Sequence, residues 1–421
     1  MRDWYDPSVL ASLLDDQPEY RVRQVQAWLA QGIDDPMAMI NLPQTLRKRL
    51  AESVPPPPRV LRTSVADGGL THKVLLAMGS DGQAVESVLM RYPRFPRGVG
   101  RATVCISTQA GCAMGCPFCA TGQIGFRRQL SIGEIVRQVT VMRRLLARGE
   151  IGAPGASSRA PGRAPGRAPD RAPDRAPDRA PDRVTNVVFM GMGEPLANID
   201  ATIGAVRWLH DRHGFGLSAR AIAVSTVGLV PGMRRLAALG LPITLAVSLH
   251  APDDALRDVL VPVNRQHPLA ELLDACRDWL AVSGRRLTFE YVLIAGVNAA
   301  PAQAEALARL VKGMRAHVNL IPMNATPAVP WRAPSIAAQR AFAAVLRRAG
   351  VPATIRYNRG TEIDAACGQL YADHALASGR TLPTAVGAAE RVERVASLRR
   401  ARCDQDSRRN LRGGGEERGP G

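Results

Sequence analysis

Three cysteines near residue 115 have a spacing that suits a metal cluster. Cys112, Cys116 and Cys119 lie in the run GCAMGCPFCATGQIGF, directly after a predicted strand, and follow the pattern C-x3-C-x2-C. Three thiolates bind three irons of an iron–sulfur cube and leave the fourth iron without a protein ligand, whereas electron-transfer clusters normally use four cysteines. An open iron can bind a substrate, so the spacing predicts a catalytic cluster.

A zinc site is the alternative interpretation of the same cysteines. Zinc normally takes four nitrogen or sulfur ligands, often from two C-x2-C pairs. No second pair follows in this sequence, but the distant His250 or Cys367 could supply a fourth ligand. The spacing alone therefore does not exclude a zinc site.

A second motif, GMGEPL, ends the hydrophobic run VVFM. Gly191 and Gly193 allow a ligand to approach the backbone at a strand end, and Glu194 can accept a hydrogen bond from an ammonium group. S-adenosylmethionine has such a group and can chelate an open iron, and a reduced cluster can then cleave its sulfonium bond to give a radical. A glycine turn alone also suits a tight strand-to-helix connection, but both motifs together predict radical chemistry.

The other four cysteines have less distinctive surroundings. Cys105 precedes the cluster motif by seven residues and Cys367 lies in AACGQL, while Cys276 falls within a predicted helix and Cys403 near the end of the chain. Free cysteines pack well as small apolar residues, so packing is the simplest interpretation of all four. Cys105 and the three motif cysteines fall within fifteen residues of a chain that shows no export signal. This clustering favours metal or redox chemistry over a disulfide framework.

Strand-like and helix-like segments alternate from residue 102 onward. Such alternation predicts an α/β fold with a parallel sheet, as a barrel or an open sheet, whose chemistry lies at the carboxyl ends of the strands. The expected strands cover 102–108, 184–191, 221–228, 243–250, 286–294 and 316–323.

The remaining segments divide the chain into regions. Residues 1–58 show helical periodicity and end in four prolines, and residues 59–104 show three strand-like runs before the core, which we place at 105–385. The interval 152–183 contains six Arg-Ala-Pro tetrapeptides, which cannot form a helix or a core and predict an extended insertion. Whether this insertion is inert or grasps RNA stays open. Residues 386–421 are expected to form a basic, disordered tail.

The composition favours a polyanionic partner. The chain has 421 residues, 46% of them hydrophobic, and a formal net charge of +18. Lys and Arg on phosphates release counterions, so this surplus is compatible with RNA or DNA binding. The run RYPRFPRGVGR at 91–101 mixes arginines with Tyr92 and Phe95 and suits either nucleic-acid contact or a proline-rich connector. No run is long and apolar enough for a membrane span and none resembles a signal peptide, so we expect a cytoplasmic protein.

These motifs together resemble the RlmN/Cfr family of radical S-adenosylmethionine methyltransferases, through about residue 385. The resemblance is carried, in chain order, by CISTQAGCAMGCPFCATGQIGF, GMGEPLANI, STVGLVPGM, VSLHAPDD, LVPVN, NLIPMN and RGTEIDAACGQL. It implies a partial (β/α)6 radical SAM barrel with a small N-terminal helical accessory domain that helps to hold RNA. It also implies two cofactors, a [4Fe-4S] cluster and S-adenosylmethionine.

The resemblance also implies roles for particular residues. Cys112, Cys116 and Cys119 would hold the cluster, Cys367 would carry the methyl group, Cys105 would resolve the resulting linkage, and Glu86 would accept a proton. The expected contacts to S-adenosylmethionine are Gly193, Glu194, Ser225, Ser248, Leu249, His250 and Asn324. Without the resemblance, Glu86 in AVESVLM reads as a solvent-facing strand residue.

The implied reaction is methylation of carbon 2 of an adenine in 23S ribosomal RNA, at the peptidyl-transferase centre, and of the adenine 3′ of the anticodon in some transfer RNAs. It consumes two S-adenosylmethionine molecules per turnover and needs an electron donor such as flavodoxin; the protein is expected to be a monomer. We prefer carbon 2 because the chain resembles the housekeeping members throughout, including NLPQTLRKRL near its start. Methylation of carbon 8 and a non-catalytic zinc-dependent RNA-binding protein are the alternatives.

Overall fold

The computed structural model describes residues 2–79, 81–93, 100–148, 183–326, 329–356, 359–370 and 390. The Arg-Ala-Pro tetrapeptides, the basic tail apart from residue 390, Cys403 and the central part of the 91–101 run lie outside these residues. Among the described residues, no helix combines the length and the apolar character that a membrane span requires.

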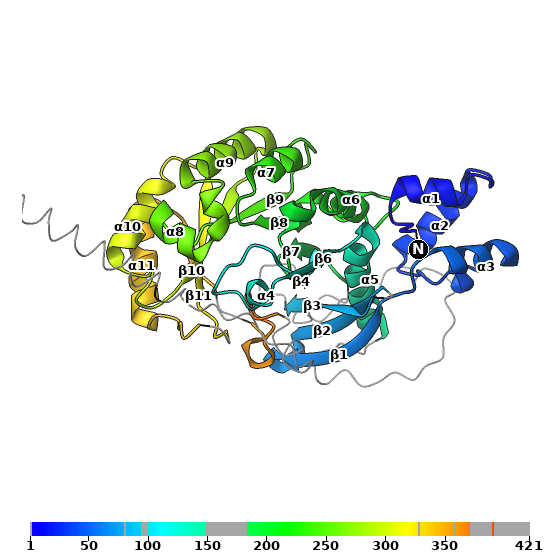
Figure 1. Ribbon diagram of the computed structural model, residues 1–421, viewed down its shortest axis with the longest axis horizontal. Coiled ribbons are helices and arrows are strands. Elements are labelled where there is room, and N and C mark those ends of the chain that lie inside the picture. Colours follow the sequence, from blue (N-terminus) through cyan, green and yellow to red (C-terminus); the bar gives the residue numbers. More distant parts are fainter. Residues whose placement is uncertain are drawn as a thin grey trace, which may run out of the picture.

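The N-terminal region is helical, as the periodicity predicts. It consists of α1 (Pro7–Leu13), α2 (Tyr20–Ala30), the short η1 (Pro36–Ala38) and α3 (Gln44–Ser53), which form a group at one end of the molecule (Figure 1). Buried Asp34 joins this group to α5 (Ile132–Arg148) through ion pairs of 3.0 Å with both Arg137 and Arg144. The helical group therefore has a fixed attachment to the rest of the chain.

Three antiparallel strands follow, at the three strand-like runs of residues 59–104. They are β1 (Arg59–Ala66), β2 (Thr71–Met78) and β3 (Gln83–Tyr92), and β3 pairs antiparallel with β4 (Arg101–Cys105). In the β3–β4 register, Val88 pairs with Cys105 and Tyr92 with Arg101. The extension thus continues directly into the first strand of the parallel region.

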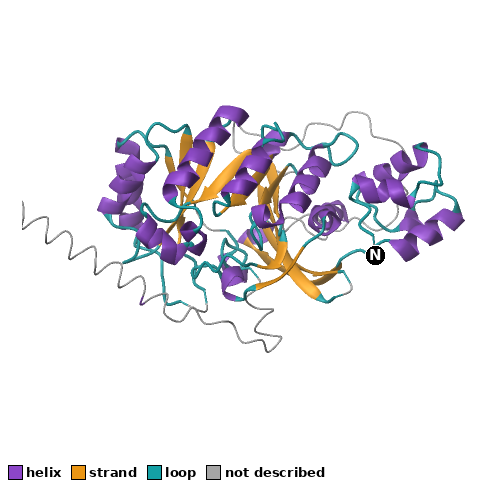
Figure 2. Cartoon of the chain, turned by 45° about the horizontal axis from the view of Figure 1, so that its top comes forward, coloured by secondary structure: helices purple, strands orange, loops and turns teal. Residues whose placement is uncertain are grey.

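The parallel region confirms the α/β fold. Its strands are β4, β7 (Asn186–Phe189), β8 (Ile222–Thr226), β9 (Thr244–Ser248), β10 (Leu287–Leu293), β11 (Ala316–Pro322) and β12 (Ala353–Ile355), which pair in that order. The connecting helices lie along one side of the strand array (Figure 2) and are α5, α6 (Ile199–His210), α7 (Val230–Ala237), α8 (Asp254–Leu260), α9 (Leu269–Ser283), α10 (Pro301–Leu310) and α11 (Ile336–Arg348). Within the described residues, six strand–helix units precede β12, the arrangement expected for a partial (β/α)6 barrel.

Four short elements were not predicted. The strands β5 (Gln109–Gly111) and β6 (Phe126–Gln129) form a separate hairpin around the cysteine motif, and α4 (Ala120–Gln123) follows Cys119. The strand β12 has three residues. Elements this short show no hydrophobic periodicity, so the sequence contains no signal for them.

A C-terminal segment connects the two ends of the sheet. Residues 359–370, which we call the Cys367 segment, contain η6 (Thr361–Ile363) and lie beside the antiparallel strands. Gly360 N donates to Asp67 Oδ2 at 3.1 Å, and Lys73 Nζ donates to Asp364 O at 3.4 Å. The segment therefore spans the opening between β12 and the first strands of the sheet.

Candidate active site

The three motif cysteines line one cavity at the carboxyl ends of the strands. Residues 111–126, which we call the cluster loop, leave β5 and return at β6, and Cys112 N donates to Gly125 O at 3.0 Å. A Cβ at Gly111 would lie 1.9 Å from Gly125 O, so the loop closes only with glycine there. Cys112, Cys116 and Cys119 all border a cavity of about 140 Å³.

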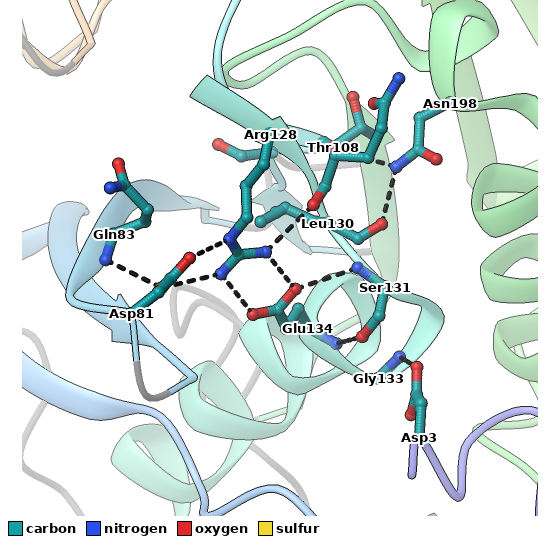
Figure 3. A network of polar contacts seen from close by, with 12 residues as sticks. Asp3, Asp81, Gln83, Thr108, Arg128, Leu130, Ser131, Gly133, Glu134 and Asn198 are labelled. Atoms are coloured by element: carbon teal, nitrogen blue, oxygen red, sulfur yellow. Dashed lines mark hydrogen bonds and ion pairs between the residues drawn. The ribbon is translucent and has the colours of Figure 1, made fainter. Parts of the chain in front are cut away.

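An ion-pair network fixes the β5–β6 hairpin that carries the cluster loop (Figure 3). Arg128 on β6 donates to both carboxylate oxygens of Glu134 on α5, at 2.7 and 2.8 Å, and also pairs with Asp81 in the β2–β3 turn. Asn198 Nδ2 donates to the carbonyls of Thr108 and Leu130, which lie side by side at the open end of the hairpin, at 2.9 and 2.7 Å. Three separate parts of the chain therefore determine where the cluster loop lies.

The chemistry of the three thiols suits a cationic cluster. Burial raises the pKa of Cys112 to about 12, and burial together with the neighbouring cysteines raises that of Cys116 well above its usual value. Burial likewise raises the pKa of Cys119. Three thiolates on one cavity, one of them buried and two half-buried, need a cationic partner that offsets their desolvation and repulsion. The donor set therefore fits the implied iron–sulfur cluster.

The GMGEPL turn forms the opposite wall of the same cavity. Gly193 has a φ of +94°, and a Cβ there would lie 2.5 Å from Gln109 Cβ, so the turn packs directly against β5. Glu194 accepts hydrogen bonds from Leu196 N at 3.0 Å and from Val227 N at 2.9 Å. Burial raises the pKa of Glu194 to about 7. A buried carboxylate of this kind is suited to an ammonium group, which would favour its ionised form.

A second cavity of about 140 Å³ adjoins the first. Ser225 at the end of β8 and Ser248 at the end of β9 border both cavities, as does His250, while Asn324 after β11 borders the second. Four of the predicted S-adenosylmethionine contacts thus lie together at strand ends. Leu249 differs, because its side chain is fully buried in the main apolar core between Ser248 and His250.

His250 is held neutral in the cavity wall. Its Nδ1 accepts a hydrogen bond from Val292 N at 3.0 Å, its ring packs edge-on against Phe118 at 4.8 Å, and burial lowers its pKa to about 3. Buried Arg257, which the sequence analysis did not single out, donates to Leu249 O at 3.1 Å and to Val227 O at 2.6 Å. Arg257 therefore fixes the ends of β8 and β9 relative to one another.

Cys105 and Cys367 border a third, larger cavity of about 400 Å³. Cys105 is buried at the end of β4, and burial raises its pKa to about 12. Cys367 is exposed and borders the second cavity as well as the third. The structure thus brings together two cysteines that are far apart in the sequence, and one of them has access to both cavities.

Glu86 lies beside this site and does not border the three cavities. It is buried on β3 and forms an ion pair of 3.0 Å with Lys73 Nζ, so it is not the solvent-facing strand residue that the sequence alone suggests. Its side chain shares a face of β3 with Val88 and Met90, which do border the third cavity.

Two further residues near the cysteines were missed in the sequence. Arg356, directly after β12, borders the second and third cavities, and the nearby Cys367 thiol raises its pKa. Glu290 on β10 borders the second cavity and lies 3.6 Å from Arg356 Nη1. The three-residue strand before Arg356 carries no sequence signal, whereas Glu290 within the apolar strand LTFEYVL is a buried charge that could have been noticed.

Comparison with known proteins agrees with this geometry. Residues 106–308 match the Radical SAM superfamily. A crystal structure of a radical SAM methyltransferase from Sphaerobacter thermophilus is 44% identical and superposes with a TM-score of 0.75, covering 88% of this chain and all of that one. Fold and site thus define a radical SAM methyltransferase, whose cofactors are a [4Fe-4S] cluster and S-adenosylmethionine.

Two curated relatives identify the family. A protein from Frankia casuarinae, described as "Probable dual-specificity RNA methyltransferase RlmN", is 49% identical over 90% of this chain and 83% of its own length. One of the same description from Roseiflexus castenholzii is 48% identical over 87% of this chain and 95% of its own length. The chain therefore belongs to the RlmN family.

Proposed function

We propose that the chain methylates carbon 2 of an adenine in 23S ribosomal RNA, at the peptidyl-transferase centre, and of the adenine 3′ of the anticodon in some transfer RNAs. Its curated relatives are described as dual-specificity RNA methyltransferases. The observation that carries the proposal is the position of Cys105 and Cys367 on one cavity of about 400 Å³, next to the cavities of the predicted cofactor contacts.

The proposed chemistry divides the work between the cofactors and the two thiols. Carbon 2 lies between two ring nitrogens and is too electron-poor to attack a sulfonium methyl group. When bound, the cluster and S-adenosylmethionine supply the methyl group and the radical that makes it reactive. Cys367 Sγ carries the methyl-derived carbon, and its place between two cavities supports this role.

Release of the product falls to Cys105 and Glu86. Once the carbon on Cys367 is bonded to the base, Cys105 Sγ attacks Cys367 Sγ, a disulfide forms, and the electrons of the broken carbon–sulfur bond pass to the new methyl carbon, which takes up a proton. Glu86 accepts the proton that leaves carbon 2, and the one unpaired electron that radical addition leaves on the ring would return to the oxidised cluster, so that the ring becomes aromatic again. Its position beside the cavity wall, next to Lys73, supports a proton-handling role. A thiol reductant must then restore both cysteines.

The proposal extends to the remaining roles. Cys112, Cys116 and Cys119 hold the cluster, Glu194 pairs with the ammonium group of S-adenosylmethionine, and the residues at the ends of β8, β9 and β11 surround the cofactor. An external electron donor such as flavodoxin reduces the cluster. The protein acts as a monomer in the cytoplasm, where ribosomal and transfer RNA are found.

Nucleoside analysis of RNA tests the proposal directly. Anaerobically reconstituted protein is incubated with S-adenosylmethionine, a reductant and a 23S RNA fragment, and the digested RNA is separated by chromatography with mass detection. We expect 2-methyladenosine. The isomer 8-methyladenosine would replace the proposal with the carbon 8 reaction. Unmodified RNA from a protein that holds zinc in place of iron and sulfide would favour a binding protein.

A further inference from the structure

The wall of the third cavity is strongly cationic. Arg101, Arg356 and Arg359 all border it, and no carboxylate is among its lining residues in the described part of the chain. Arg356 is partly neutralised by Glu290, at 3.6 Å. Arg101 and Arg359 form no ion pair with any residue that the structure describes. Within the described part of the chain, no carboxylate neutralises these two positive charges.

Tyr92 holds both guanidinium groups in place. The guanidinium carbon of Arg101 lies 4.5 Å from the centre of the Tyr92 ring, and that of Arg359 lies 4.4 Å from it. Arg101 lies on β4, directly opposite Tyr92 on β3. Arg359 comes from the Cys367 segment, and its Nη1 also donates to Arg91 O at 3.1 Å. A ring attracts each cation but does not remove their mutual repulsion, which an anion would offset.

The position along β4 indicates which part of an RNA chain these arginines meet. Arg101 begins β4 and Cys105 ends it. A strand rises by about 3.4 Å per residue, so the two backbone positions lie roughly 13 Å apart. Arg101 therefore lies at the opposite end of β4 from Cys105, and Arg359 shares the Tyr92 ring with it. From this we infer that the two guanidinium groups meet the nucleotides around the reacting base and not the base itself.

We propose that Arg101 and Arg359, positioned by Tyr92, bind backbone phosphates of the nucleotides next to the target adenine in an unpaired RNA segment. This inference rests on the proposed function, because it assigns the contacts of the same RNA substrate. Phosphate contacts fix the register of a nucleic acid without reading its sequence. The arginines would therefore hold the backbone while the target base enters the cavity between Cys105 and Cys367.

The test measures RNA affinity as a function of salt for Arg101→Ala, Arg359→Ala and the double variant. Each lost phosphate contact should lower the slope of log K against log salt by about 0.7 and weaken binding roughly tenfold at low salt. The loss should be equal for RNA with adenine and with guanine at the target position. KM for RNA should rise while kcat stays near the wild-type value.

Three further variants separate charge from structure. Arg309→Ala removes an exposed arginine on α10 and should leave slope and KM unchanged. Arg359→Lys keeps the charge and should restore the slope. Tyr92→Leu keeps both arginines but removes the aromatic ring that holds their guanidinium groups, so it should raise KM for RNA. If the alanine variants keep the wild-type slope and KM, or lose only thermal stability and bound iron, the arginines are structural and the inference is wrong.

The same experiment separates this failure from a failure of the proposed function. Suppose that the wild-type protein forms 2-methyladenosine and that the arginine variants behave like Arg309→Ala. The proposed phosphate contacts would then be wrong, and the proposed function would stand. Wild-type protein that methylates no RNA would overturn both.

Discussion

The two loops that bring cysteines to the active site are held in different ways. The cluster loop is closed by a strand pair and fixed by the ion pairs of Arg128 to Asp81 and Glu134. The Cys367 segment contains only one short turn and is held mainly by hydrogen bonds to backbone groups, and its thiol is exposed. The difference fits the two tasks proposed above, because a cluster needs ligands in fixed positions, whereas a sulfur that passes a group on would have to reach both of the cavities that Cys367 borders.

The two loops nevertheless meet. Ala120 N donates to Gly368 O at 2.6 Å, and Thr121 Oγ1 donates to Leu370 O at 3.3 Å. On the other side, Asn324 Nδ2 donates to Cys367 O at 3.0 Å. The Cys367 segment therefore takes its position partly from the cluster loop, whereas the cluster loop has its own supports. Changes in the Cys367 segment should thus disturb the active site less than changes in the cluster loop.

The largest effect is expected from the cluster ligands. Reconstituted protein should carry about four irons, and Cys112→Ala, Cys116→Ala or Cys119→Ala should each remove them together with all methylation. Iron and sulfide analysis and the visible spectrum measure this. Cys276→Ala, in α9 and away from the three cavities, is the control and should keep its iron. An active, colourless, zinc-loaded protein would contradict the role of the cluster loop.

The two thiols of the large cavity should differ from each other. Cys367→Ala removes the methyl carrier and should give neither methylated RNA nor a protein–RNA adduct, although it keeps its iron. Cys105→Ala keeps the carrier but lacks the sulfur nucleophile that resolves the linkage, so a covalent adduct should accumulate. The readout is a slowly migrating, nuclease-sensitive band. Equal RNA methylation by the wild type and both variants would show that Cys105 and Cys367 are packing residues without a role in the reaction.

The sequence predicts the parts of this site that follow local rules. The cysteine spacing, the glycine turn before Glu194 and the strand ends at Ser225 and Ser248 can all be located from periodicity and motif. Cys105 and Cys367 required the resemblance to known proteins, because bare sequence cannot distinguish a reactive thiol from a packed one.

Other parts could not be predicted, for a physical reason. The Lys73–Glu86 ion pair depends on the register of two strands, and the stack of Arg101 and Arg359 on Tyr92 joins segments more than 250 residues apart in the sequence. Leu249 faces the core because successive side chains near a strand end alternate, and the motif alone does not state which of them face the cavity. Contacts of this kind exist only after the fold has formed.

A smaller effect is expected from the support of the cluster loop. Arg128→Ala removes charged hydrogen bonds in a partly exposed network, so it should lower the free energy of unfolding by about 1–2 kcal/mol. It should also speed the loss of iron on dilution. Arg277→Ala removes an exposed ion pair to Asp274 on α9 and should cost less than about 0.5 kcal/mol. Equal effects of the two variants would mean that Arg128 does not support the cluster loop.

The smallest effect is expected in the Cys367 segment itself. Buried Gln369 donates through Nε2 to Ala325 O at 3.3 Å and to Asp364 Oδ1 at 3.2 Å, and Gln369→Leu removes both bonds at similar volume. Two long bonds contribute about 1 kcal/mol together, which corresponds to roughly fivefold more frequent local opening. Hydrogen exchange of a peptide covering 359–370 should therefore quicken by about that factor.

The comparison of the two loops depends on what happens elsewhere in Gln369→Leu. If the Cys367 segment is the less firmly supported of the two, exchange in residues 111–126 and the iron content should both stay at wild-type values, because Arg128 and the β5–β6 pairing remain intact. Methylation should fall by no more than a few-fold, since Cys367 still reaches both cavities. Faster exchange in the cluster loop to the same extent would show that the contacts from Ala120 and Thr121 make the two loops one cooperative unit.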